Sequence, residues 1–235
     1  QYQRSSIRDA KTDRIDALRL ARIGIMEKRL PAFCATLEAL GAKKALSLIA
    51  TLERTKQQLV RSAKQFRATQ ELLSLPVNCN EMDAIIKGIT GQISSLYEQV
   101  LALTNEKVKQ LAVVTPGLSQ RQVAVVATAL SGAHFTDRDQ LVAYVGLDIR
   151  KRESGTWHGK EKISKRGNPF VRKVLFQIGW SLKQHNEQYR DYFEKLKQKG
   201  KHYFTCILAV ARKFLRFFFA HFRQKGSSLT FSTAM

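Results

Sequence analysis

Hydrophobic residues recur at helical spacing along most of the 235-residue chain, and this pattern predicts a mainly α-helical protein. A first helix is expected from about residue 8 to residue 25. Its apolar positions follow the helical period and form one face. They are Ile7, Ala10, Ala17, Leu18, Ala21 and Ile25.

Three aspartates, Asp9, Asp13 and Asp16, lie on the opposite side of this helix. At spacings of four and three residues their carboxylates crowd together, which is unfavourable unless water, a neighbouring arginine or a divalent cation screens them. The pattern therefore fits either a solvated acidic stripe or one part of a magnesium site. A magnesium site would need further carboxylates from elsewhere in the protein.

Two long helices are expected at about residues 35–73 and 80–105, with a break at Pro76. Their apolar positions step by four and three residues, as in the seam of a coiled coil. These positions are Leu48, Leu52, Thr55, Leu59, Ser62, Phe66, Thr69 and Leu73 in the first helix, and Met82, Ile86, Ile89, Ile93, Leu96, Val100 and Leu103 in the second. The pattern predicts an antiparallel hairpin with its turn at Pro76 to Asn80. It leaves open whether the hairpin is buried in a bundle, or projects to dimerise or hold another macromolecule.

Residues 111–132 contain two apolar helical segments joined by Pro116 to Leu118. This arrangement resembles a helix-hairpin-helix motif, in which backbone N–H groups at the turn, here at Gly117, bind a nucleic-acid phosphate without reading sequence. Ser119 stands where a second glycine is usual. A helix-turn-helix packing unit without nucleic-acid contacts fits the same pattern.

The remaining elements are a short helix near residues 137–144, a basic loop whose flanks form a small β-hairpin, and two final helices. Asn168 as N-cap and Pro169 at the first helical position begin the first of these helices. Its predicted buried stripe is Phe170, Val174, Leu175, Ile178 and Leu182, and that of the last helix, about residues 203–222, is Ile207, Leu208, Ala211, Phe214, Leu215 and Phe218. Residues 226–235 are expected to be disordered.

The net charge of the chain indicates which kind of molecule it binds. The net charge is +21, and residues 150–225 carry 20 basic and 5 acidic residues, a balance of +15. So large an excess is typical of a protein that binds nucleic acid. No segment reaches roughly 18 uncharged apolar residues, so we expect a soluble protein that does not enter a membrane. The three cysteines lack metal-ligand spacing, which indicates reduced thiols in a cytoplasmic protein.

Ser154 and Gly155 lie within the most basic stretch. A serine beside a glycine has little steric cover, and the surrounding cations can hold a phosphodiester against its hydroxyl. Ser154 is therefore either a nucleophile or a solvated turn residue, and Ser164 is expected to hold the loop or a phosphate. The predicted nucleic-acid surface comprises Lys11, Arg150, Arg152, Lys160, Lys165 and Arg166.

Several short motifs occur in a fixed order along the chain. They are KTDRIDALRLA (11–21), TPGL (115–118), LVAYVGL (141–147), SG (154–155), ISKRGN (163–168) and AVARK (209–213). In this order and with these separations they resemble the IS110 family of insertion-sequence transposases, relatives of the Piv DNA invertases. The resemblance covers almost the whole chain.

The resemblance implies three parts: the last helix of an N-terminal RuvC-like (RNase H-like) domain, a coiled-coil hairpin, and a helical C-terminal transposase domain. The expected boundaries are residues 1–30, 31–108 and 109–225, followed by a tail at 226–235. Asp13 and Asp16 match the last two acids of the family's DEDD metal site, and Ser154 matches its serine nucleophile. The first Asp and the Glu of that site are expected upstream of residue 1, so this chain alone is expected to be inactive.

Membership would further imply magnesium as cofactor, a structured bridge RNA that guides target and donor DNA, and a dimer or tetramer. Ser154 would then attack a scissile phosphodiester, form a serine–DNA link and leave a 3′-hydroxyl for rejoining to another strand. Two other functions fit the residues. One is a non-catalytic nucleic-acid-binding protein, and the other is a metal-dependent Holliday-junction nuclease in which carboxylates activate water.

Overall fold

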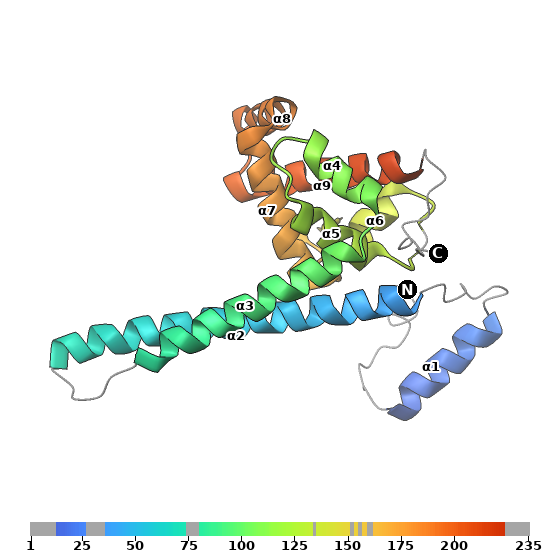
Figure 1. Cartoon of the computed structure of the whole chain (residues 1–235). Helices are drawn as coiled ribbons and strands as arrows, with labels where there is room; N and C mark the ends of the chain where they lie inside the picture. The colour runs from blue at the N-terminus through green and yellow to red at the C-terminus, as the bar shows by residue number, and fades with distance from the viewer. Residues whose placement is uncertain are drawn as a thin grey trace. The chain divides into compact units, whose positions relative to one another are not determined.

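The computed structural model describes residues 13–26, 36–73, 80–133, 135–150, 153–154, 157–158 and 162–223. The chain divides into two units, residues 1–34 and 35–235 (Figure 1). Within the described residues there are nine α-helices and four two-residue strands, which confirms the prediction of a mainly α-helical protein. None of the described helices is long and apolar enough to cross a membrane.

The first unit contains one described helix, α1 (Asp13–Met26). It confirms the predicted helix from residue 13 onward, whereas residues 8–12 lie outside the described part. Apolar side chains of this helix are exposed, with 56% of Leu18 and 84% of Ile25 accessible to solvent. The assignment of residues 1–30 to a RuvC-like domain stays a prediction.

Helices α2 (Leu37–Leu73) and α3 (Asn80–Ala102) form the predicted antiparallel hairpin (Figure 1). Arg67 Nη2 lies 2.6 Å from Asp83 Oδ2, and the Tyr97 hydroxyl donates to Glu53 Oε1 at 2.9 Å. Partners on α3 therefore move toward higher numbers as those on α2 move toward lower ones, which defines opposite helix directions. The predicted turn at Pro76 to Asn80 falls largely on residues 74–79, outside the described part.

The seam of α2 differs from the prediction at five of its eight positions. Leu52, Leu59 and Phe66 are partly buried as expected, but the predicted positions Leu48, Thr55, Ser62, Thr69 and Leu73 are exposed. The seam instead uses the residues that directly follow four of these exposed positions. They are Ile49, Lys56, Ala63 and Gln70. Both registers keep a spacing of four and three residues, and Lys56 and Gln70 contribute aliphatic stems that a search for apolar residues overlooks.

The predicted seam of α3 is correct apart from its end. Ile93 and Val100 are buried, and the intervening seam positions are partly buried. The helix ends at Ala102 rather than near residue 105, which leaves Leu103 39% exposed. Ile93, Val100 and Ile49 belong to the main hydrophobic core, so this part of the hairpin is built into the body of the second unit.

Glu53 links the hairpin to the rest of the second unit. Its Oε1 accepts from Tyr97, and its Oε2 lies 2.5 Å from Lys173 Nζ on helix α7 (Pro169–His185). Burial and the Glu53 carboxylate together raise the pKa of Tyr97 far above its usual value, so its hydroxyl remains protonated and able to donate. Glu53 therefore joins three helices through two hydrogen bonds.

Replacing Glu53 with Ala should lower the free energy of unfolding by about 1–2 kcal/mol, because a partly buried tyrosine and a lysine both lose their partner. Urea denaturation would measure this change. Asp83→Ala is the matched control, since its bond to Arg67 is exposed and its loss should cost under about 0.5 kcal/mol. Equal losses in the two variants would show that Glu53 does not join the helices energetically.

The remaining helices pack around α5 and α9 (Figure 1). Their bounds are α4 (Glu106–Val114), α5 (Gln120–Leu130), α6 (Arg138–Tyr144), α8 (Glu187–Gln198) and α9 (Tyr203–Arg223). Helix α5 is buried continuously from Val123 to Thr128 and contacts α2, α3, α4 and α7. A helix that is apolar on every side is expected at the centre of a fold, and α5 occupies that place.

The predicted stripe of α7 is buried at every position, and Asn168 Oδ1 accepts from Phe170 N at 2.9 Å as the N-cap. The stripe of α9 is likewise buried, except that Leu208 is only partly covered. The sequence prediction missed α8. This helix is strongly polar and buries only Tyr189 and Phe193 on its apolar side.

Candidate functional site

The basic loop between α6 and α7 forms a nested β-hairpin, as predicted from its flanks. Strands β1 (Ile149–Arg150) and β4 (Lys162–Ile163) pair antiparallel at the base, and β2 (Glu153–Ser154) and β3 (Trp157–His158) pair nearer the tip. Ser154 is paired with Trp157 in the last described pair before the tip. The fold therefore presents the candidate nucleophile at the distal end of a short ladder, while its side chain lies outside the described part.

Asp148 and Ser164 close the base of this hairpin. Ser164 N donates to Asp148 O at 2.9 Å, and Ser164 Oγ donates to Asp148 Oδ1. The same hydroxyl oxygen accepts from Arg166 N at 3.5 Å. These bonds support the prediction that Ser164 holds the loop.

The ISKRGN turn after the hairpin interlocks with the turn that ends α6. Gly146 has a φ of +74°, and a Cβ there would come within 2.7 Å of the backbone nitrogens of Arg166 and Gly167. A Cβ on Gly167 would collide with the carbonyl oxygen of Tyr144. Only glycine allows the two backbones to approach this closely.

This interlock fixes the conformation of Lys165, whose φ is +57° and whose N–H donates to Gly146 O at 3.1 Å. The left-handed region costs a non-glycine residue about 1 kcal/mol, so the surrounding structure must enforce it. Strained residues of this kind concentrate at functional sites. The conformation therefore makes Lys165 a candidate functional residue.

Lys165 and Arg166 are exposed, and neither side chain has a hydrogen-bond or ion-pair partner among the residues that the structure describes. Arg172, by contrast, is engaged, because its Nη1 donates to Gly167 O and supports the turn from α7. Two cations without a partner among the described residues therefore lie next to the base of the hairpin. The side chains of the other predicted contacts, Lys11, Arg150, Arg152 and Lys160, lie outside the described residues.

Helix α9 supports the same region through the AVARK motif and the turn that follows it. Arg212 Nη1 lies 3.5 Å from Leu147 O, and Arg216 donates to Asp139 Oδ1 from Nε at 3.2 Å and from Nη2 at 2.9 Å. These arginines fix α6 and the start of the hairpin on α9. Arg212 and Arg216 therefore stabilise the fold in addition to contributing positive charge.

Gly117 lies away from the basic hairpin. It has a φ of +88°, and a Cβ there would lie 2.9 Å from Ser181 O and 3.1 Å from His185 Cβ, near the C-terminal end of α7. Asn168 marks the other end of that helix, roughly 20 Å away at 1.5 Å per residue. Helices α4 and α5 confirm the two predicted segments, but close packing on α7 is enough to explain the glycine. A phosphate contact at Gly117 stays a prediction.

Comparison with known proteins separates the possible functions. Residues 110–194 match the sequence model of the transposase IS116/IS110/IS902 family. This segment contains the whole basic hairpin and both of its interlocked turns. This segment of the chain is therefore similar to the IS110 family of transposases.

Relatives along most of the chain agree with this similarity. Pilin gene-inverting proteins of Moraxella bovis and Moraxella lacunata are 28% and 27% identical over 223 residues, which cover 91% of this chain and 66% of each relative. An insertion element IS110 protein of 43.6 kDa from Streptomyces coelicolor is 22% identical over 168 residues, 68% of this chain and 42% of that protein. The chain therefore spans about two thirds of the length of the pilin gene-inverting proteins.

Asp13 and Asp16, the predicted metal ligands, lie three residues apart in the first turn of α1, on one side of the helix. Asp13 is exposed and Asp16 is partly buried. Carboxylate oxygens are suitable magnesium ligands, and Mg²⁺ often uses only one or two of them. The pair can therefore supply part of a site, although no cluster of three or more acidic, histidine or cysteine ligands occurs among the described residues.

Sequence analysis missed the residue that fixes Ser164. Asp148 is separated from Ser164 by the whole hairpin, and its signal in the sequence is its position two residues before the basic run begins at Arg150. An aspartate at the opening of a loop often caps a local turn instead. The pairing became visible only when strands β1 and β4 brought the two residues together.

Proposed function

We propose that this chain is part of a DNA transposase or site-specific recombinase that cleaves and exchanges strands through Ser154. The observation that carries the proposal is the match of residues 110–194 to the transposase family, because that segment contains a hairpin with a serine near its tip and, at its base, cations without partners among the described residues. The left-handed conformation of Lys165 is a second supporting observation, because such residues are enriched at functional sites.

In the proposed reaction, the Ser154 oxygen attacks a scissile phosphorus while the bond from that phosphorus to the 3′ oxygen breaks. The serine proton passes to solvent, and the leaving oxygen takes up a proton to become a 3′-hydroxyl. A 3′-hydroxyl of another strand then attacks the phosphoserine and releases Ser154. Each step exchanges one phosphodiester for another, so no external energy source is needed.

Lys165 and Arg166, at the base of the hairpin, would bind phosphates of the DNA backbone away from the scissile bond and hold the strand in place while Ser154 attacks near the tip. Their backbone is held by Gly146, Gly167 and the Ser164 hydroxyl, so little motion is required when DNA binds. Ser164 and Asp148 act through this positioning. Arg150, Arg152 and Lys160 would add to this nucleic-acid surface in the second unit, and Lys11 is proposed as a nucleic-acid contact in the first.

The proposal includes a magnesium site at Asp13 and Asp16, completed by carboxylates that the described residues do not supply. Magnesium held by such carboxylates would supply positive charge of the kind that assists phosphodiester chemistry. By resemblance to this family, the protein would also use a structured guide RNA and work as a dimer or tetramer in the cytoplasm. Ribonuclease treatment before the strand-exchange assay and sedimentation of the active complex would test these two features.

Replacing Lys165 and Arg166 together with Ala should weaken DNA binding and flatten its dependence on salt, because each phosphate contact contributes about −0.9 to the slope of log K against log salt concentration. Titrations of a labelled duplex at several salt concentrations measure the slope. The double variant Lys195→Ala and Lys199→Ala removes the same charge outside the family match and should change the slope less. Equal slopes in the natural protein and the first double variant would count against the proposed surface.

A further inference from the structure

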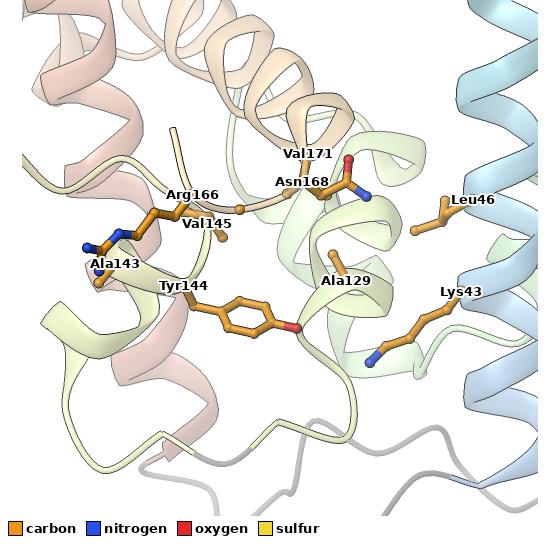
Figure 2. A pocket seen from close by; sticks show the side chains of 10 residues that line it. Lys43, Leu46, Ala129, Ala143, Tyr144, Val145, Arg166, Asn168 and Val171 are labelled. Atoms are coloured by element: carbon orange, nitrogen blue, oxygen red, sulfur yellow. The ribbon is translucent and has the colours of Figure 1, made fainter. Parts of the chain in front are cut away.

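A pocket of about 560 Å³ lies between helix α2 and the interlocked turns of the candidate site. Its walls come from α2, from the end of α6 and from the start of α7 (Figure 2). Leu46 and Val171 are buried and give the pocket an apolar floor. The volume lies in the range of pockets that hold a small organic group, and it is far too small for a base-paired duplex.

The polar groups of this pocket are hydrogen-bond donors. Lys43, Tyr144 and Asn168 line it, and Figure 2 shows the ends of the Lys43 and Tyr144 side chains directed toward each other from opposite walls. The side chain of Arg166 extends away from Lys43 in the same view. No acidic residue is among those lining the pocket. The pocket therefore favours a ligand with a negative charge.

Neither the Lys43 ammonium nor the Tyr144 hydroxyl has a hydrogen-bond partner in the part of the chain that the structure describes. The Asn168 carbonyl oxygen caps α7, which leaves its amide N–H groups for a ligand. Burial lowers the pKa of Lys43, because its charge is partly removed from water without a counter-ion. A bound phosphate would supply that counter-ion.

Tyr144 adds an aromatic wall. Its side chain is 47% exposed, and Phe135 contacts the ring at 5.2 Å between centroids with 71° between the ring planes. An edge contact of this kind braces the ring and leaves a face available for stacking. An aromatic face beside a cation is the arrangement that proteins use for an unpaired base and its phosphate.

We infer that this pocket binds one unpaired nucleotide of a nucleic-acid strand, with its phosphate at Lys43 and Asn168 and its base stacked on Tyr144. The choice of nucleic acid rests on the proposed function. Asn168 belongs to the same turn as Lys165 and Arg166, so a strand bound at those cations has only a few residues of protein surface to cross. A base displaced from its duplex can enter the pocket, whereas a paired base cannot.

The test compares an oligonucleotide carrying one central 2-aminopurine as a single strand and as a duplex, with the intact protein. Stacking on Tyr144 should quench the fluorescence of the single strand. Tyr144→Leu and Lys43→Gln should each weaken single-strand binding about tenfold and leave duplex binding within about twofold. Tyr144→Phe, which keeps the ring, should retain most of the quenching.

Matched controls are Lys44→Gln, an exposed lysine next along α2, and Trp180→Leu, an aromatic residue 45% exposed on α7. Both should leave single-strand and duplex binding unchanged. Thermal melting of each variant shows whether it is folded. If Tyr144→Leu is unfolded, the affinities of Lys43→Gln alone test the inference. The same oligonucleotide made as RNA shows whether the pocket prefers DNA or RNA. The strand that binds more tightly to the natural protein should lose more affinity in Tyr144→Leu and Lys43→Gln.

Two results would overturn the inference. One is single-strand affinity that is unchanged in both pocket variants, and the other is an equal loss for single strand and duplex. Either result leaves the proposed function standing if duplex binding still depends on Lys165 and Arg166. If the intact protein binds no nucleic acid at all, both the inference and the proposed function fail.

Discussion

Replacing Ser154 with Ala should abolish the covalent protein–DNA adduct in an assay with the intact protein, its nucleic-acid partners and magnesium. Removal of a serine nucleophile costs on the order of 10⁶-fold in rate, because no other group takes its place. Denaturing gel electrophoresis of labelled DNA measures the adduct directly. Ser154→Cys should retain slight activity, since a thiolate can attack phosphorus but is less well placed. Omission of magnesium should also prevent the adduct.

Ser164→Ala is the matched control for this prediction. The Ser164 hydroxyl is already bonded to Asp148 and to the Arg166 backbone, so its loss should loosen the turn and lower the adduct yield by about tenfold rather than abolish it. Simple loss of transposition would not separate the two serines, whereas the adduct does. An adduct that persists in Ser154→Ala and disappears in Ser164→Ala would reverse the assignment.

Replacing Gly167 with Ala should destabilise the second unit by about 3 kcal/mol or more, the largest effect on stability expected in the candidate site. The new Cβ would collide with the Tyr144 carbonyl and crowd the Val145 backbone, and neither atom can move aside as a side chain would. The ISKRGN turn would separate from α6, and the bound positions of Lys165 and Arg166 would be lost. Urea denaturation measures the stability change, and duplex titration measures the loss of binding.

Gly88→Ala provides the opposite control. Gly88 lies in α3 with open space where its Cβ would be, so alanine should stabilise the protein by about 0.5–1 kcal/mol through its higher helix propensity. The two variants make the same chemical change in different surroundings. A Gly167→Ala protein that unfolds at the same urea concentration as the natural one would show that the interlock does not constrain the turn.

Local signals predicted much of the fold. The cap at Asn168 and the apolar stripes of α7 and α9 were visible because they follow the helical period with little interruption. The predicted seam of α2 was wrong at five of eight positions, because two of the true seam positions use the aliphatic stems of Lys56 and Gln70. Helix α8 was not predicted because most of its residues are polar. Its aromatic side chains are buried only by tertiary packing.

The candidate site was predictable where its signal is local. The order of the motifs led to Ser154 and to the ISKRGN turn, and the family match includes both. The link between Asp148 and Ser164 depends on strand pairing, and the pocket at Lys43 and Tyr144 joins positions about a hundred residues apart in sequence. Such contacts leave no periodic pattern, so they become visible only in the folded structure.

The most direct test of the account is mass spectrometry of a trapped protein–DNA complex after nuclease digestion. The account predicts one modified peptide, with the remaining nucleotide attached to the oxygen of Ser154. A non-catalytic binding protein would show no attachment, and a nuclease that activates water would cut DNA without any covalent intermediate. A nucleotide on Ser164, on a tyrosine, or on no residue of a protein that cleaves DNA would contradict the proposed mechanism.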